Sequence, residues 1–260
     1  MSSDAVLYLH NRRLIAAEAE LFGSSAEQAR VFRAPGIVGA VNPHAPDRSI
    51  FNWCIAESTS LLLAGYSALA DAYVQAGVRA WTVWLDPGDE YGARELGARG
   101  HLLDAQPLAM GAEIGALGLP EAGDLDARET RDATIIATLN EAAYTFPPPA
   151  FRAAFERICD PRWHAHVAFD GDRPVACVMI YDSEDGDAGV SCVATLPEVR
   201  GRAFASRLLG SALRAAVKRG CGTTSLQATS KGAPVYARLG YRNLGAMSMW
   251  EHRVRAPSPV

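Results

Sequence analysis

Hydrophobic residues recur at helical spacing near the C-terminal end of the chain. Residues 188–196 are mostly apolar and end at a proline, which is typical of a buried strand. After a short basic turn, residues 201–219 carry apolar side chains at the i, i+3, i+4, i+7 spacing of one buried helical face: Ala205, Leu208, Leu209, Ala212, Leu213, Ala216 and Val217. The pattern therefore predicts a strand that runs through a turn into a helix.

Further elements surround this strand and helix. Residues 164–169 and 174–181 are predicted to be strands, and the Asp-Gly step between them, at 170–171, is a hairpin signal. Residues 223–229 predict another strand, and residues 230–241 a short helix that ends at Gly240. The second half of the chain is thus predicted to contain both helices and strands.

A helix-loop-helix is predicted before these strands. Residues 132–144 and 152–158 are helical in pattern, and Pro147, Pro148 and Pro149 lie between them. Consecutive prolines cannot continue a helix, because each lacks a backbone N–H and clashes with the preceding turn. We therefore expect an interruption there.

The first half of the chain repeats this order of elements. A helix over residues 61–76, a strand over 80–85 and a second helix match the helix, strand and helix of the second half. Each half has a glycine at the end of both helices: Gly77 and Gly100 are 23 residues apart in the first half, and Gly220 and Gly240 are 20 apart in the second. Met110 follows Gly100 by ten residues, as Trp250 follows Gly240. Two copies at this period predict two related domains rather than a solenoid.

The repeat and the intervening composition divide the chain. Residues 118–131 begin with Gly-Leu-Pro and are rich in acidic side chains, so we interpret them as a linker between domains at 1–117 and 132–260. Each domain is expected to be a mixed α/β (α+β) fold, with a mostly antiparallel sheet flanked by helices.

Composition restricts the class of protein. The chain is 49% hydrophobic and 21% charged, with a formal net charge of −4. Dispersed basic residues give no electrostatic footprint for nucleic acid or anionic membranes, and the longest apolar runs are too short to cross a bilayer. Five cysteines without C-x-x-C pairs predict reduced thiols, and the start of the chain lacks a signal peptide pattern. We expect a cytoplasmic protein, monomeric or homodimeric, with no bound metal.

The turn before the helix at 201–219 has the properties of a phosphate cradle. Backbone N–H groups at a helix N-terminus, together with the helix dipole, bind a pyrophosphate if no large side chain blocks it. Here the turn is basic at Arg200 and Arg202, whereas Gly201, Ala203 and Ala205 are small.

This turn resembles the acyl-coenzyme A signature of the GCN5-related N-acetyltransferase (GNAT) family, Q/R-x-x-G-x-G/A. Ala203 departs from the signature, because the first glycine is expected at that position. A second likeness lies downstream, where Tyr236 precedes the Gly240-Tyr241 pair by four residues, as in the later motif of the family. Two motifs in the right order and context are more specific than either alone. The resemblance covers roughly residues 125–255.

The resemblance implies an acetyl-coenzyme A dependent N-acetyltransferase that acts on a small-molecule or protein amine by direct transfer. In it, Val193 and Thr195 would bind the pantetheine arm through backbone groups, the N–H of Val193 would stabilise the oxyanion, and Tyr236 would protonate the leaving thiolate. Phe146 and Phe151 would border the acceptor, or else fix the proline loop to the core. The cofactor-binding set is Val193, Ala194, Thr195, Arg200, Gly201, Arg202, Ala203, Phe204, Ala205, Ser206 and Ser230.

The first half is expected to lack this activity. When Gly77 is aligned with Gly220, Glu57 falls opposite Arg200, and a carboxylate there would repel a diphosphate. Alignment from the other end puts Leu96 opposite Tyr236, so the proton donor is missing as well. We interpret the first half as a degenerate copy that shapes the substrate pocket.

Alternatives to this function remain open. The departure at Ala203 and the absence of a clear base also fit a module that senses acyl-coenzyme A without turnover. Another acyl donor or a hydroxyl acceptor fits the fold too. Cys192 suggests a covalent route, although a small apolar strand residue is the simpler interpretation. The acidic turn at 182–187 is either an amine-attracting site or solvated surface, and His164 and His166 lack a third ligand for a metal.

Overall fold

The computed structural model describes residues 2–254, which divide into two compact units. Unit 1 contains the chain up to Leu14 together with Leu108–Gly245, and unit 2 contains Ile15–Pro107 with the segment from Ala246 onward. These divisions differ from the boundaries predicted at 117 and 132, because each unit includes a segment from the other half of the sequence.

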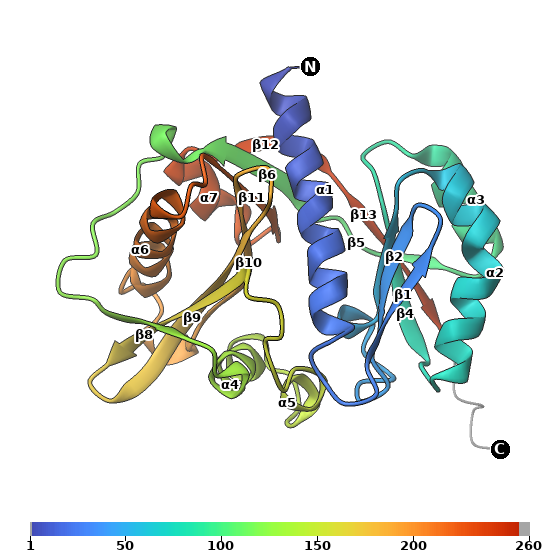
Figure 1. Ribbon diagram of the computed structural model, residues 1–260, viewed down its shortest axis with the longest axis horizontal. Coiled ribbons are helices and arrows are strands. Elements are labelled where there is room, and N and C mark those ends of the chain that lie inside the picture. The colour runs from blue at the N-terminus through green and yellow to red at the C-terminus, as the bar shows by residue number, and fades with distance from the viewer. Residues whose placement is uncertain (1, 255–260) are drawn as a thin grey trace. The chain divides into compact units, whose positions relative to one another are not determined.

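Unit 2 is built on a six-stranded sheet in the order β1-β2-β3-β4-β13-β5. Its core lies between the sheet and two helices, with Leu62 and Tyr73 from α2, Leu96 from α3, and Trp81 and Val83 from β4. Figure 1 shows both helices beside this sheet. The elements are β1 (Arg30–Ala34), β2 (Ile37–Val41), η1 (Ser49–Phe51), β3 (Trp53–Ala56), α2 (Thr59–Gln75), β4 (Ala80–Leu85), α3 (Glu90–Ala98), β5 (Leu102–Ala105) and β13 (Ser248–Arg253).

Unit 1 is built on a seven-stranded sheet in the order β12-β6-β11-β10-β9-β8-β7. In it β6 pairs with β11, β7 with β8, β8 with β9, and β9 with β10 in antiparallel fashion, whereas β10 and β11 are parallel. The elements are β6 (Leu108–Glu113), η2 (Ile114–Ala116), β7 (Asp126–Thr130), α4 (Ala133–Tyr144), α5 (Ala150–Ala154), β8 (Trp163–Asp170), β9 (Arg173–Asp182), β10 (Asp187–Thr195), η3 (Pro197–Val199), α6 (Phe204–Lys218), β11 (Thr223–Ala228), α7 (Ala233–Leu239) and β12 (Arg242–Ala246). The predicted mixed, mostly antiparallel fold is confirmed, and it occurs twice.

The predicted repeat is visible in backbone hydrogen bonds at the helix ends. The N–H of Gly77 donates to the carbonyl of Val74, as that of Gly220 donates to Val217. Gly77 and Gly220 have φ values of 70° and 107°, in the left-handed region that glycine reaches without strain. Both helices therefore stop in the same way.

The last strand of each half joins the sheet of the other half. In unit 1, β6 pairs with β11 and places Met110 opposite Leu226. In unit 2, β13 pairs with β4 and places Trp250 opposite Val83. The repeat aligns Met110 with Trp250 and Leu226 with Val83, so the two halves exchange their last strands with the same pairing register.

Helix α1 (Ser3–Phe22) contributes its first part to unit 1. There, Asn11 donates to the backbone carbonyls of Met110 and Leu226, at 3.1 and 2.7 Å. A Cβ on Gly189 of β10 would approach the Leu14 side chain to 2.5 Å, so the absence of a side chain lets the helix lie close to the sheet. Figure 1 shows α1 and α6 on opposite sides of this sheet.

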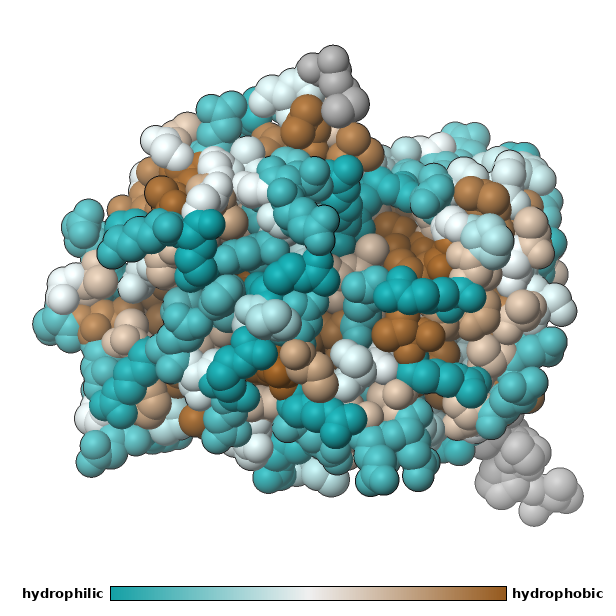
Figure 2. All heavy atoms as spheres, in the orientation of Figure 1, coloured by the Kyte–Doolittle hydropathy of each residue, from teal (hydrophilic) through white to brown (hydrophobic). Residues whose placement is uncertain are grey.

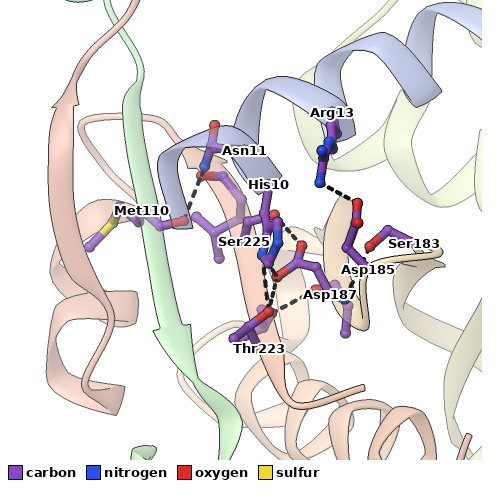
Figure 3. A network of polar contacts seen from close by, with 12 residues as sticks. His10, Asn11, Arg13, Met110, Ser183, Asp185, Asp187, Thr223 and Ser225 are labelled. Atoms are coloured by element: carbon purple, nitrogen blue, oxygen red, sulfur yellow. Dashed lines mark hydrogen bonds and ion pairs between the residues drawn. The ribbon is translucent and has the colours of Figure 1, made fainter. Parts of the chain in front are cut away.

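A buried carboxylate reinforces the contact of α1 with the sheet (Figure 3). Asp187 is 2% exposed and accepts hydrogen bonds from Ser225 Oγ at 2.6 Å and Thr223 Oγ1 at 2.8 Å. His10 Nδ1 lies 3.3 Å from the same carboxylate. The ion pair of Arg13 with Asp185 lies beside this network. Two hydroxyl donors, with the His10 ring beside them, therefore compensate the buried carboxylate.

Some predicted elements differ from the structure. The predicted linker contains strand β7, which pairs with β8, because residues 126–130 extend the sheet at its edge. The helix predicted over residues 152–158 is the single turn α5, which begins two residues earlier and ends at Ala154. The helix predicted from residue 201 begins at Phe204, because Gly201 and Ala203 have positive φ.

The surface carries both hydrophilic and hydrophobic residues, as the ordinary composition of the sequence leads us to expect. Figure 2 shows mainly hydrophilic residues on the visible face, with smaller hydrophobic areas between them. Among residues 2–254, no helix combines the length and the apolar character needed to cross a bilayer.

Candidate functional site

Strands β10 and β11 separate partway along their length in unit 1. Their parallel pairing covers Asp187 with Thr223, Ala188 with Thr224 and Gly189 with Ser225, and then stops, although both strands continue. Beyond Gly189, backbone groups on the facing edges of the two strands are therefore available to a ligand that pairs like a strand.

A β-bulge lies on β10 just beyond this separation. Ser191 pairs with Met179 and Ala194 with Cys177, so Cys192 and Val193 together face a single residue of β9. Cys192 has a φ of 49°, which is uncommon for a residue with a side chain. The bulge places the predicted oxyanion donor, the N–H of Val193, at the irregular part of the strand.

The predicted phosphate turn leads into a helix that no side chain caps. Ala203 is the N-cap of α6, with φ 60° and ψ 17°, and makes no side-chain hydrogen bond to the first turn. Gly201 is also left-handed, and no atom lies within 4 Å of the position of a Cβ there. The N–H groups that begin α6 lack intrahelical acceptors, so this end of the helix suits an anion.

The two arginines of the turn have protein partners. Arg200 donates to the carbonyls of Ala143, at 2.7 Å, and Thr195, at 3.3 Å, so it joins the end of α4 to the end of β10. Arg202 forms an ion pair with Asp170 at 2.6 Å and lies over the ring of Phe204. Both side chains are partly exposed, and their charges remain beside the start of α6.

Tyr236, the predicted proton donor, lies half-buried in α7. Its ring packs edge-on against Tyr241, with centroids 5.6 Å apart. Burial, and secondarily the phenol of Tyr144, raises the pKa of the Tyr236 hydroxyl above its usual value. The phenol therefore keeps its proton at neutral pH.

The predicted acceptor residues occupy different environments. Phe151 is 4% exposed and packs on Phe155, with ring centroids 6.1 Å apart, so it agrees with the interpretation as an aromatic staple. Phe146 is half-buried, with its ring 6.2 Å from that of Phe151. The buried carboxylate of Glu141 accepts from the N–H groups of Phe151 and Arg152, which fixes the proline loop to α4. Ser230 lies exposed in the turn after β11.

Unit 2 differs from unit 1 at the equivalent place. Ser58 caps α2 by accepting from the N–H of Leu61, and Thr59 bonds the carboxylate of Asp89. The repeat aligns Ser225, the last residue of β11 that pairs with β10, with Thr82 of β4. In unit 2 the pairing of β3 with β4 continues two residues further, to Ile55 and Trp84. The start of α2 therefore already has a side-chain acceptor in Ser58 and a carboxylate beside it in Asp89, and the strands beside it do not separate at that point.

Other candidates from the sequence have structural roles. In the acidic turn, Asp182 forms an ion pair with Arg219 and Asp187 is buried, so the turn is not a free cluster of negative charge. His164 lies between Glu129 and Asp182. Glu198 is paired with Arg173, and its pKa is lowered by a backbone hydrogen bond and by that arginine. Within residues 2–254, no three His, Cys, Asp or Glu side chains are arranged to hold a metal.

Sequence reasoning missed two residues of α4. Asn140 is 2% exposed, and Tyr144 donates its hydroxyl hydrogen to the carbonyl of Val193 at 2.7 Å. Asn140 follows Ile136 and Leu139 on the apolar stripe of its helix, and a polar residue on such a stripe is a signal for a buried hydrogen-bonding role. The exposed Tyr144 has no comparable signal.

Comparisons with known proteins cover the chain to different extents. The Acetyltransferase (GNAT) family profile matches residues 132–241. A search of curated proteins gives no significant match. Similar solved structures include a GCN5-related N-acetyltransferase from Kribbella flavida, with a TM-score of 0.63 and 19% identity over 94% of this chain and 96% of that one.

Two further structures match nearly the whole chain. A GCN5-related N-acetyltransferase from Sphaerobacter thermophilus has a TM-score of 0.54 and 19% identity, covering 96% of this chain and 93% of that one. A tandem GNAT protein from the clavulanic acid biosynthesis pathway has a TM-score of 0.55 and 12% identity, covering 96% of each chain. At these identities the likeness shows the fold. Residues 132–241 therefore form a domain of the GNAT acetyltransferase family, and over nearly its whole length the chain shares its fold with a tandem GNAT protein.

Proposed function

We propose that the protein is an acetyl-coenzyme A dependent N-acetyltransferase whose C-terminal half carries the active site. The observation that supports this most is the contrast between the repeats. In unit 1 the strands separate beside an uncapped helix start, whereas in unit 2 Ser58 and Asp89 occupy the start of α2. A diphosphate would meet free N–H groups in the first case and a competing carboxylate in the second.

In the proposed reaction, a neutral primary amine attacks the carbonyl carbon of the bound thioester. The C–N bond forms, the C–S bond breaks, and the thiolate takes a proton from Tyr236. The amine nitrogen loses a proton to water, and the Tyr236 phenolate regains one from water, so no net proton is released. Backbone N–H groups at the bulge stabilise the oxyanion, because fixed dipoles need no reorganisation. The Tyr236 phenol is protonated at neutral pH, as a general acid must be. The proposal assigns no side chain as the base.

Calorimetric titration with acetyl-coenzyme A tests the binding part of this proposal. We expect one site per chain. Ala205→Asp places a carboxylate at the second residue of α6 and should abolish binding, whereas Ser60→Asp at the second residue of α2 should not change it. Acidic residues favour the first turn of a helix, so neither change should unfold its unit. Two sites, or equal losses in both variants, would contradict a single working half.

Turnover separates catalysis from sensing. Release of free coenzyme A thiol, measured with a panel of primary amines, is expected for the wild-type protein. Binding without thiol release for any amine in the panel would favour the sensing module. Thiol release with alcohols instead of amines would favour O-acyl transfer.

A further inference from the structure

Asn140 and Tyr144 lie four residues apart on α4, so their side chains share one face of the helix. Both reach the bulge of β10. Asn140 Nδ2 lies 3.5 Å from the carbonyl oxygen of Cys192, and Tyr144 Oη lies 2.7 Å from that of Val193. One helical face therefore contacts two consecutive carbonyl groups of the bulge.

The first of these contacts fixes a peptide plane. The Cys192 carbonyl also accepts from the Cys177 thiol of β9 at 3.3 Å. Asn140 Nδ2 donates to the carbonyl of Ile136 at 2.9 Å and lies 3.5 Å from the same Cys177 sulfur, so the amide group of Asn140 is fixed from both sides. In a trans peptide, the N–H of Val193 points opposite to the carbonyl of Cys192. The Val193 N–H is therefore directed away from the Cys177 thiol and from the amide group of Asn140.

The second contact controls the neighbouring carbonyl. An unbonded carbonyl oxygen beside a developing oxyanion would repel it, and rotation of the Val193–Ala194 peptide would also disturb the N–H of Val193. The Tyr144 hydroxyl holds this carbonyl in a hydrogen bond. Arg200 donates to the carbonyl of Ala143 and so fixes the end of α4 that carries Tyr144.

We propose that Asn140 and Tyr144 are positioning residues that hold the β10 bulge with the Val193 N–H directed at the thioester carbonyl. This inference rests on the proposed function. Neither side chain is assigned a step in bond making. Each acts through the orientation of a peptide group, which matters because an oxyanion donor must lie close to where the charge develops.

Infrared difference spectra of bound acetyl-coenzyme A labelled with 13C at the thioester carbonyl test the orientation directly. In the wild type, a hydrogen bond from Val193 should lower the carbonyl stretching frequency below that of the free ligand in an apolar solvent. Tyr144→Phe removes one oxygen from a side chain that is 51% exposed, so the fold should be kept. We expect the band to shift toward the apolar value and kcat to fall about tenfold, with acetyl-coenzyme A affinity within twofold.

Matched variants complete the experiment. Tyr91→Phe removes the same oxygen from a tyrosine of unit 2 that is 49% exposed, and should change neither the band nor kcat. Asn140→Leu should shift the band in the same direction as Tyr144→Phe. If it does not fold, Tyr144→Phe alone decides the outcome.

The outcomes separate the two proposals. A lowered band in the wild type that Tyr144→Phe leaves unchanged would overturn the positioning role and keep the proposed function. A wild-type band that is not lowered although the ligand binds would overturn the positioning role as well. A protein that does not bind acetyl-coenzyme A would overturn the proposed function and, with it, this inference.

Discussion

Met110, from the first half of the sequence, lies opposite Leu226, from the second half, in the pairing of β6 with β11. The side of β11 away from β10 is therefore completed by a strand that lies more than a hundred residues earlier in the chain. The candidate site lies next to β11, so its geometry depends on both halves.

A fragment of residues 118–260 should not fold by itself. It lacks β6 and the part of α1 that contacts Gly189 and Asp187, so the backbone edge of β11 and an apolar sheet face would be exposed. We expect few backbone amides of the isolated fragment to be protected from hydrogen exchange. Co-expression with residues 1–117 should restore protection, and a stable, folded fragment on its own would contradict the strand exchange.

Ala203→Gly should stabilise the protein. Ala203 has a φ of 60°, where a Cβ costs about 1–2 kcal/mol, and the greater flexibility of glycine in the unfolded chain offsets part of the gain. We expect an increase of about 0.5 kcal/mol in the free energy of unfolding, measured with urea. Ala205→Gly, inside the same helix, is the control and should lower it by about 1 kcal/mol.

Tyr236→Phe should lower kcat while the dissociation constant of acetyl-coenzyme A changes little. Loss of a general acid typically reduces the rate by about 10²- to 10⁴-fold. The variant keeps the ring that packs on Tyr241, so the fold should be unchanged. A rate equal to that of the wild type at neutral pH would remove Tyr236 from the mechanism.

Stability should fall as the pH decreases from about 6.5 to about 4. Burial lowers the pKa of His101 in unit 2 and of His166 in unit 1 to about 4. Between those values the unfolded state binds more protons than the folded state, so each histidine reduces stability by about 2 kcal/mol between pH 7 and pH 5. Urea unfolding at both pH values measures this loss.

His166→Leu is the matched test of that explanation. The Nε2 atom of His166 is buried without a hydrogen-bond partner within the described part of the chain, so an apolar replacement of similar size leaves no new unpaired group. The pH dependence of unit 1 should become weaker. An unchanged slope would assign the acid sensitivity to other groups.

Asp187→Ala should strongly destabilise unit 1. The change removes the acceptor of Ser225 and Thr223 and the partner of His10, all near the start of the β10–β11 pair. Removing one member of a buried charged network costs about 3–5 kcal/mol. Thermal unfolding measures the loss, with Asp185→Ala at the exposed ion pair as a control expected to cost less than about 1 kcal/mol.

The local elements could be predicted from the sequence better than their assembly. Strand β4 and the ends of α2 and α6 follow from periodicity and from glycines such as Gly77 and Gly220, because these signals are local. The exchange of β6 and β13 could not be predicted, since Met110 and Trp250 carry the same pattern whichever sheet they join. For the site, the turn at 200–206 was visible in the sequence. The hydrogen bond from Tyr144 to Val193 was not, because it depends on how α4 packs across the sheet.

The exchange of β13 also has a consequence for synthesis of the protein. Trp250 pairs with Val83 in the sheet of unit 2, yet it follows Val83 by more than 160 residues in the chain. The first strands and helices of unit 2 therefore leave the ribosome early, but the edge of β4 stays unpaired until β13 has also been made. A nascent chain stalled before residue 248 should therefore be a substrate for chaperones.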